Sequence, residues 1–201
     1  MNILGKLFGS EAKVKIMRLF IFNPEAVFDM EMISSKSKVD MKNARKEVSI
    51  LEKSGLVRKK SFFKTVLKKR KERKKKAHGY ALNQDFAYMT TLKSLLTSGK
   101  VTKGEEILKR LSKAGKLKLV IVAGVFTEDK DSRLDILVVG NNLNKAVLSG
   151  AIRSIEAEIG RELMYACFET PDFQYRLGMY DKLIRDVLDY PHNVLLDKIL
   201  S

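Results

Sequence analysis

The stretch from Arg58 to Lys76 is the feature that most restricts how this chain can fold. Twelve of its 19 residues are Lys or Arg, and only Glu72 is acidic. Buried charges need partners of opposite sign, so this segment has to run over the surface and not through a core. At this density its side chains would neutralise several phosphates and release counterions from a nucleic acid. We therefore expect a polyanion-binding arm, with a solvated and partly disordered loop as the alternative.

The positive charge is concentrated in the first part of the chain. Residues 1–80 hold 22 Lys and Arg against 8 Asp and Glu, a balance of +14. Residues 81–201 hold 17 against 16, a balance of +1. Such asymmetry indicates a basic module joined to a nearly neutral one.

Composition excludes several classes of protein. A single cysteine rules out a disulfide framework and a cysteine-based zinc module, and the histidines, His78 and His192, are far apart. We therefore expect no metal and no cofactor. The longest apolar run, residues 119–126, is too short to cross a bilayer, and the first residues lack the apolar core of a signal peptide. The sequence thus predicts a cytoplasmic protein that does not bind membranes.

Three amphipathic segments in the basic module carry the signals of short helices. Each begins with a Ser or Asp that can cap a helix, and the first and third end at Asn23-Pro24 and Ser54-Gly55. The predicted helices, counted from their N-caps, cover residues 10–22, 29–35 and 40–53. A tight turn between the second and third would complete a helix-turn-helix arrangement.

The third predicted helix divides into two faces. Ala44, Val48 and Leu51 recur at helical spacing and should pack on the other two helices. The remaining face carries side chains that can reach phosphates or base edges in a major groove. The candidate DNA-binding residues of this helix are Lys42, Asn43, Arg45, Lys46, Ser49 and Lys53.

After Gly55 the pattern changes from helix to strand. Residues 56–63 and 79–83 are predicted strands, with the Lys/Arg stretch between them. The phrases Leu51-Glu52-Lys53-Ser54-Gly55-Leu56-Val57 and Gly79-Tyr80-Ala81-Leu82-Asn83 resemble the helix-to-wing junction and the wing return of the winged helix-turn-helix family of transcriptional regulators. The resemblance covers residues 8–83. It implies a DNA-binding domain over residues 1–83 with a wing, residues 58–78, that is longer and more basic than usual.

The same resemblance implies that the wing contacts phosphates and reaches toward the minor groove. Double-stranded DNA is the expected partner, although a basic arm does not by itself distinguish DNA from RNA. The candidate DNA-binding residues of the wing are Lys59, Lys60, Lys64, Lys68, Lys69, Arg70, Lys71, Arg73, Lys74, Lys75 and Lys76.

Residues 84–104 are predicted to form a helical linker. Apolar residues at helical spacing between Phe86 and Leu96 indicate a helix over about residues 85–96, and a further helix is expected over about residues 103–114. This apolar stripe either packs in the chain's own core or forms the contact of a homodimer. Winged-helix regulators often dimerise through a helix after the wing, which is an argument by analogy.

Strands and helices alternate over residues 105–201, which predicts a small mixed-sheet domain. Its predicted strands cover residues 117–125, 134–139 and 163–168, and its predicted helices cover residues 144–159 and 180–188. The whole chain is therefore expected to be a two-domain α+β or α/β protein.

Gly124-Val125, followed after nine residues by Asp135-Ile136-Leu137-Val138, resembles the signature of the minimal nucleotidyltransferase family of the polymerase-beta-like superfamily. Members of that family hold Mg²⁺ with two or three carboxylates on adjacent strands. Here Leu137 stands in the second acid position, and residues 164–168 contain no carboxylate, with Glu169 just beyond them. The resemblance therefore implies an inactive domain that keeps only Gly124 and Asp135 of the motif. Magnesium or a nucleotide is expected only if a residual site persists.

The leading hypothesis is a DNA-binding transcriptional regulator that is not an enzyme. Its inactive second domain would serve dimerisation, sensing or partner binding. The alternatives are an active nucleotidyltransferase and an antitoxin-like partner of a toxin protein, a role found in this family. Cys167 is expected to be a buried small hydrophobic residue, and His192 a structural or surface residue.

Overall fold

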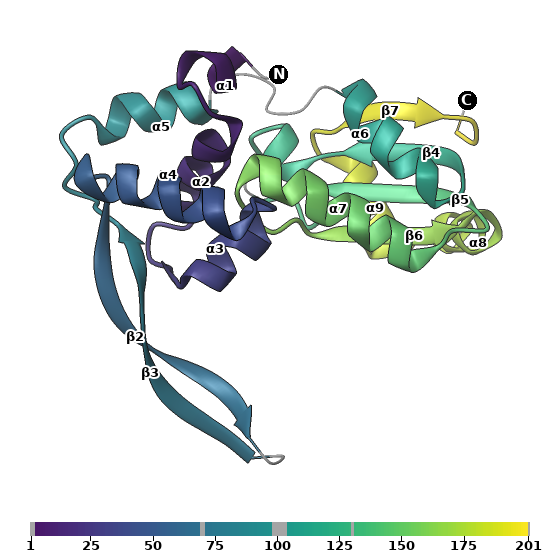
Figure 1. Ribbon diagram of the computed structural model, residues 1–201. Coiled ribbons are helices and arrows are strands. Elements are labelled where there is room, and N and C mark those ends of the chain that lie inside the picture. The colour runs from purple at the N-terminus through teal and green to yellow at the C-terminus, as the bar shows by residue number, and fades with distance from the viewer. Residues whose placement is uncertain (1–2, 69–70, 98–103, 130, 201) are drawn as a thin grey trace. The chain divides into compact units, whose positions relative to one another are not determined.

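The computed structural model describes residues 3–68, 71–97, 104–129 and 131–200. They form a mixed α+β structure with two separate sheets, which agrees with the general fold class predicted from the sequence. The chain divides into two compact units (Figure 1). Unit 1 comprises Met1–Val101 and Glu156–Arg161, and unit 2 comprises Thr102–Ile155 and Glu162–Ser201. In the described parts of the chain, no helix is long and apolar enough to span a membrane.

Three of the first four helices of unit 1 begin where the capping residues predict, and the short helix before them, Ile3–Leu7, was not predicted. Ser10, Asp29 and Asp40 each accept a hydrogen bond from the backbone N–H three residues ahead, at 3.1, 2.8 and 3.0 Å. Lys38 adopts a left-handed conformation (φ 50°) that ends the second capped helix and makes the expected tight turn. The helices are α1 (Ile3–Leu7), α2 (Glu11–Phe22), α3 (Met30–Ser37) and α4 (Met41–Lys53).

The core of unit 1 lies where α2, α3 and α4 meet. Ile16 and Phe20 of α2, Ile33 of α3 and Ala44 of α4 are all completely buried. The Phe20 ring meets the Phe28 ring edge-on, with their centroids 5.6 Å apart. Burying a large apolar side chain contributes about 1.5–3 kcal/mol. This apolar centre therefore holds the three helices together and leaves the outer face of α4 to the solvent.

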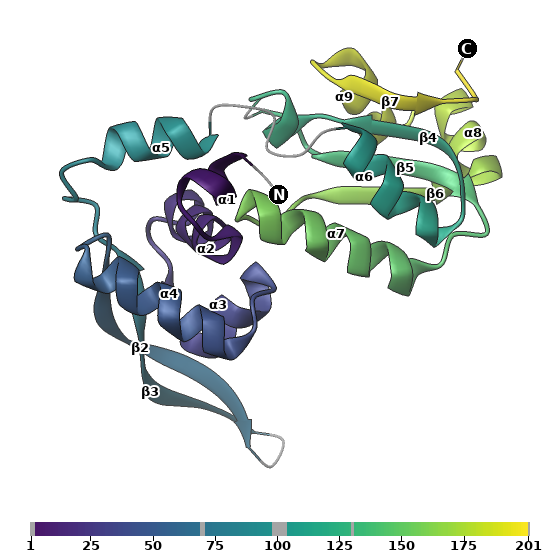
Figure 2. The same cartoon turned by 45° about the horizontal axis from the view of Figure 1, so that its top comes forward.

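The first sheet contains a long β-hairpin. Its strands are β1 (Val27–Phe28), β2 (Val57–Lys68) and β3 (Lys71–Leu82), antiparallel and in the order β1-β3-β2. Figures 1 and 2 show β2 and β3 as a twisted ribbon that extends beyond the helices of unit 1. The strands predicted over residues 56–63 and 79–83 were too short. Most of the basic stretch is itself strand, because the ladder joins backbone groups and does not require apolar side chains.

The helix after the hairpin, α5 (Met89–Thr97), packs on the same core. Leu96 is completely buried, and Phe86, Met89 and Leu92 are partly buried against the core of unit 1. The apolar stripe predicted here is therefore part of an intrachain core. The helix starts at Met89 and not near residue 85, because the segment before it turns, with Phe86 N–H donating to the Asn83 carbonyl (3.2 Å). Residues 98–103 of the predicted linker lie outside the described residues.

Unit 2 is built on a sheet with the strand order β6-β5-β4-β7. β4 pairs antiparallel with β5 and β7, and β5 pairs parallel with β6. One side of the sheet packs its apolar residues against α8 and α9, and Figure 2 shows α6 and α7 on the other side. The elements are α6 (Gly104–Leu111), η1 (Ser112–Ala114), β4 (Lys116–Val122), η2 (Gly124–Phe126), β5 (Ile136–Asn141), α7 (Lys145–Ile159), β6 (Tyr165–Glu169), α8 (Thr170–Gly178), α9 (Lys182–Asp189) and β7 (Asn193–Asp197).

Two elements of unit 2, α8 and β7, were absent from the sequence prediction. α8 begins with a proline in its first turn, a good helix start, but buries only Phe173 completely, so its apolar periodicity is weak. β7 is an edge strand without regular alternation of buried and exposed residues. The strand predicted over residues 117–125 also ends earlier, at Val122, because the chain turns there into η2.

Candidate nucleic-acid interface

The outer face of α4 carries the side chains that the sequence assigned to it. Ala44, Val48 and Leu51 point into the core and are at most 4% exposed. A helix buried on this stripe must present its other side to solvent. The predicted residues on that side are all exposed, namely Lys42, Asn43, Arg45, Lys46, Ser49 and Lys53.

The glutamates of α4 do not oppose this cationic face. Glu47 is only 6% exposed, and its Oε2 lies 3.7 Å from Nζ of Lys13 on α2. Glu52 pairs through Oε1 with Nζ of Lys59 on β2, at 3.0 Å. Both carboxylates are therefore directed toward cations within the chain. The exposed side of α4 keeps its positive potential.

Asn43 is held in a defined position at the start of α4. Its side-chain amide donates to Oδ2 of Asp40 (2.6 Å), while its backbone N–H donates to Oδ1 (3.0 Å). These hydrogen bonds lower the pKa of the Asp40 carboxyl, so the N-cap stays ionised. The amide of Asn43 still has a second N–H and its oxygen for an external partner.

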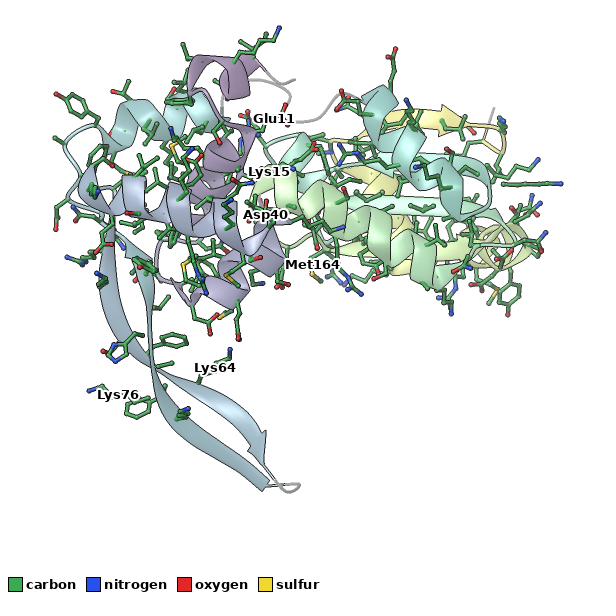
Figure 3. The ribbon with its side chains drawn as sticks, in the orientation of Figure 1. Glu11, Lys15, Asp40, Lys64, Lys76 and Met164 are labelled. Atoms are coloured by element: carbon green, nitrogen blue, oxygen red, sulfur yellow. The ribbon has the colours of Figure 1, made fainter. Side chains whose placement is uncertain are left out.

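The register of the hairpin sorts its side chains onto two faces, because successive residues of a strand point to opposite sides. Figure 3 shows Lys64 and Lys76 extending to opposite sides of the ribbon. What we call the open face carries Lys59, Ser61, Phe63, Thr65, Lys74, Lys76, His78 and Tyr80. What we call the inner face carries Lys60, Phe62, Lys64, Lys75, Ala77 and Gly79.

Close packing on β1 requires a glycine on the inner face. A Cβ on Gly79 would lie 2.6 Å from the carbonyl oxygen of Phe28 and 3.1 Å from the ring of Phe62. The contact with the Phe28 carbonyl leaves no room for a Cβ, and the Phe62 ring would also have to shift slightly. Gly79 therefore lets β3 lie directly against β1, which anchors the base of the hairpin.

Lys64 links the inner face to α3. Its Nζ donates to Oδ2 of Asp29 (2.7 Å) and to Oε2 of Glu31 (3.3 Å). These hydrogen bonds, the one to Asp29 first, raise the pKa of Lys64. Burial pushes the pKa of Asp29 up, but hydrogen bonds from Lys64 and from the backbone N–H of Met32 lower it overall. Lys64 thus acts as a brace between hairpin and helix.

The predicted wing residues fall into four groups. Lys59 and Lys64 are already paired with carboxylates of the chain. Within the described residues, Lys60, Lys74, Lys75 and Lys76 are exposed and form no ion pair. Lys68, Lys71 and Arg73 lie at strand positions near the tip of the hairpin, whereas Lys69 and Arg70 lie outside the described residues.

Phe63 is a residue of the open face that the sequence reasoning missed. Its side chain is 70% exposed, and it lies opposite Lys76 in the ladder. Ser61 and His78, also on this face, approach within 3.3 Å through Oγ and Nδ1. Alternation gave no signal for this exposure, because it puts Phe63 on the same strand face as Val57, which is buried at the base of the hairpin. An exposed aromatic ring among cations suits a nucleobase or a sugar.

Gly124 and Asp135, the two residues on which the sequence resemblance to nucleotidyltransferases rests, are engaged with each other and with nearby backbone groups. Asp135 is 5% exposed; its Oδ1 accepts from the N–H of Val125 (2.9 Å) and its Oδ2 from the N–H of Met164 (2.8 Å). Gly124 has a left-handed conformation (φ 53°), and a Cβ there would collide with Oδ1 of Asp135. Gly124 and Asp135 therefore fit each other, and Asp135 ties the end of β4 to β5 and to the start of β6.

The other candidate side chains of unit 2 have structural partners or lie apart from one another. Glu169 accepts hydrogen bonds from the backbone N–H groups of Asn142 and Leu143 (3.0 and 2.9 Å). Cys167 is half-buried in β6, and Nδ1 of His192 lies 2.8 Å from the carbonyl of Tyr190. In the part of the chain that the structure describes, no cluster of three or more His, Cys, Asp or Glu could hold a metal.

Comparison of this chain with protein-family models, with curated proteins and with solved structures found no match. The function therefore has to be argued from the residues themselves, and the strongest concentration of unusual chemistry is the cationic surface of α4 and the hairpin.

Proposed function

We propose that this chain is a DNA-binding transcriptional regulator whose first unit acts as a winged helix. α4 would enter a major groove, and the hairpin of β2 and β3 would be the wing. The observation that carries the proposal is the exposed cationic face of α4, whose own glutamates are buried or paired, in the same unit as a hairpin with exposed lysines on both faces. The major groove of B-DNA, about 12 Å wide, admits one helix of this kind.

The two surfaces would have different tasks. Recognition helices contact bases mainly through their N-terminal residues, so Lys42, Asn43 and Lys46 are best placed for base edges. Arg45 can bind guanine or a phosphate with two parallel hydrogen bonds. The wing lysines, which are flexible point charges, would contact phosphates and set the position of the protein on the duplex.

The second unit would be a nucleotidyltransferase-like domain that has lost catalysis and serves dimerisation, sensing or partner binding. Asp135 makes hydrogen bonds to the chain's own backbone through both oxygens, and the neighbouring acid position holds Leu137, which is 1% exposed. Two-metal phosphoryl transfer needs at least two carboxylates that face a common site. An active nucleotidyltransferase is therefore not favoured, and no specific observation favours an antitoxin role.

The test is fluorescence anisotropy of the full-length protein on a mixed-sequence duplex across a salt series. We expect tight binding at low salt with a steep salt dependence. Replacing Lys74, Lys75 and Lys76 with Gln should lower the slope by about 0.9 for each phosphate that the variant no longer neutralises. The matched control replaces three exposed lysines of unit 2, Lys109, Lys145 and Lys182, with Gln.

Each outcome has a clear meaning. A smaller slope in the wing variant alone supports a wing that contacts phosphates. Equal reductions in the wing and control variants would mean that binding follows net charge alone, which contradicts the proposal. No binding at low salt, or tighter binding to double-stranded RNA than to DNA, would also overturn it.

A further inference from the structure

Unit 2 contains a groove at the opposite end of β4 from Gly124 and Asp135. It lies where α6 and η1 meet the start of β4 and the end of β7, and has a volume of about 460 Å³. Its walls include Leu108, Ser112, Lys116, Lys118, Leu196 and Lys198. Neither the proposed DNA-binding surface nor the nucleotidyltransferase motif uses any of these residues.

The lysines of the groove are brought together by the sheet. The backbone N–H of Lys198 donates to the carbonyl of Lys118 (2.9 Å), so the two residues are neighbours across adjacent strands. Lys116 lies two residues before Lys118 on β4. Like charges opposite each other in a sheet are destabilising. An anion bound between them would relieve this repulsion. Within the described residues, none of these three lysines forms an ion pair.

This cluster is not a by-product of a basic chain. Residues 81–201 carry a net charge of only +1, with 17 Lys and Arg against 16 Asp and Glu. Elsewhere in unit 2 basic side chains do pair, as Arg133 does with Asp186 at 2.7 Å and Arg176 with Asp172 at 3.1 Å. The three lysines around the groove are therefore a local concentration of positive charge.

The size and lining of the groove restrict the ligand. Its volume is in the range of small-molecule sites, about 300–1,000 Å³. A specific duplex interface instead covers an extended surface of about 1,000 Å² or more. The half-buried Leu108 and Leu196 offer an apolar wall beside the ammonium groups. A ligand that contacts both the ammonium groups and the apolar wall must carry several negative charges on a compact group, and it must also have an apolar or aromatic body.

We infer that this groove binds a small organic phosphate. Its phosphate groups would lie between Lys116, Lys118 and Lys198, and its body would lie on the leucines. Phosphate esters carry several negative charges on one compact group. They therefore complement three ammonium groups better than a ligand with a single carboxylate would. This inference concerns unit 2 alone and does not depend on DNA binding by unit 1.

The experiment is isothermal titration calorimetry of the full-length protein with ATP, in buffer of about 0.15 M salt to screen weak surface binding. Gln replaces Lys116, Lys118 and Lys198 together in the groove variant. The matched control is the wing variant with Gln at residues 74, 75 and 76, which removes the same charge. We expect ATP to bind about tenfold more weakly to the groove variant and with unchanged affinity to the wing variant. Lys118→Gln alone, expected to weaken ATP binding less, serves if the triple variant does not fold.

Adenosine and inorganic triphosphate separate the two parts of the ligand. We expect both to bind more weakly than ATP, because each lacks either the charge or the body. Inorganic triphosphate binding as tightly as ATP would overturn the assignment of an organic ligand. Equal weakening of ATP binding in the groove and wing variants, or no ATP binding by the native protein, would overturn the site itself. Weaker duplex binding by the groove variant without ATP binding would assign the lysines to nucleic acid and also overturn it.

Discussion

Phe62 and Phe63 are adjacent in the chain, but strand alternation gives them opposite environments. Phe62 is half-buried on the inner face beside Gly79, whereas Phe63 is 70% exposed opposite Lys76. We expect Phe63→Ala to change the free energy of unfolding by less than about 0.5 kcal/mol, because the ring packs little. Duplex binding should weaken by roughly 1 kcal/mol, about fivefold, if the ring contacts a base or sugar.

Urea unfolding and anisotropy measure these two effects of Phe63→Ala separately. Phe62→Ala is the matched control, and we expect it to lower the free energy of unfolding because it removes packing on the inner face. Unchanged duplex affinity in a folded Phe63→Ala protein would exclude a role for this ring in binding.

Asp135 has a structural role in this fold, because both of its carboxylate oxygens accept hydrogen bonds from backbone N–H groups. Asp135→Asn keeps the shape but turns one acceptor oxygen into an NH₂ that faces a backbone N–H. We expect a decrease of about 2 kcal/mol in the free energy of unfolding, measured by urea titration. Asp189→Asn, at an exposed pair with Arg185, should cost less than about 0.5 kcal/mol. Equal stability of the Asp135→Asn and native proteins would show that the carboxylate is free for another role.

At the scale of elements, the hairpin separates lysines that brace it from lysines that remain available. Lys64 and Lys75 are opposite each other in the ladder, but Lys64 is bound to Asp29 and Glu31 while Lys75 is exposed. A lysine that is already neutralised releases fewer counterions from DNA. We expect Lys75→Gln to reduce the salt slope of duplex binding by about 0.9 and Lys64→Gln to reduce it clearly less. The same reduction for both would refute the bracing role.

The link between α3 and the hairpin also predicts a dependence of stability on pH. The folded-state pKa of Asp29 lies below its ordinary value of 3.8, so its ionised form stabilises the native state above that value. This contribution is lost as the pH falls through the lower, folded-state pKa. The gap in urea midpoint between the native protein and Asp29→Asn should therefore be constant above about pH 5 and shrink below 3.8. A gap that widens on acidification would contradict this sign.

The elements that could be predicted from sequence are those with local signals. The caps Ser10, Asp29 and Asp40 and the apolar spacing of α4 are local, and the helices begin where they indicate. The full length of the hairpin was missed because backbone pairing, and not side-chain pattern, extends it. β7 was missed because an edge strand is defined by its partner β4.

Within the candidate site, exposure on α4 followed from helical periodicity alone, whereas the environments of the wing residues did not. The pairing of Lys64 with Asp29 joins residues 35 positions apart, so no local pattern reports it. The exposure of Phe63 is not reported by alternation either, because Phe63 shares a strand face with the buried Val57 and is exposed only because the hairpin extends beyond the core. Contacts between distant segments therefore account for most of the corrections.

At the scale of the whole molecule, the charge distribution and the division into units coincide closely. The excess of +14 lies in residues 1–80, all within unit 1, while residues 81–201 are nearly neutral. Electrostatic attraction of a polyanion should therefore act on unit 1 first. The groove lysines of unit 2 are too few to compete with it for a duplex, but sufficient for a small anion.

The concentration of positive charge in unit 1 predicts which lysines a bound duplex protects, and this can be measured on the intact protein. Lysine acetylation followed by mass spectrometry should show that excess duplex protects Lys42, Lys46 and Lys74–Lys76. Lys145 and Lys182 of unit 2, which are also exposed, should react at the same rate with and without DNA. A lysine that contacts a DNA phosphate is neutralised by it and shielded from the reagent. We therefore expect slower acetylation only at lysines that contact the duplex. Uniform protection across both units would mean that the duplex collects on the protein without a defined surface, and would contradict a winged-helix mode of binding.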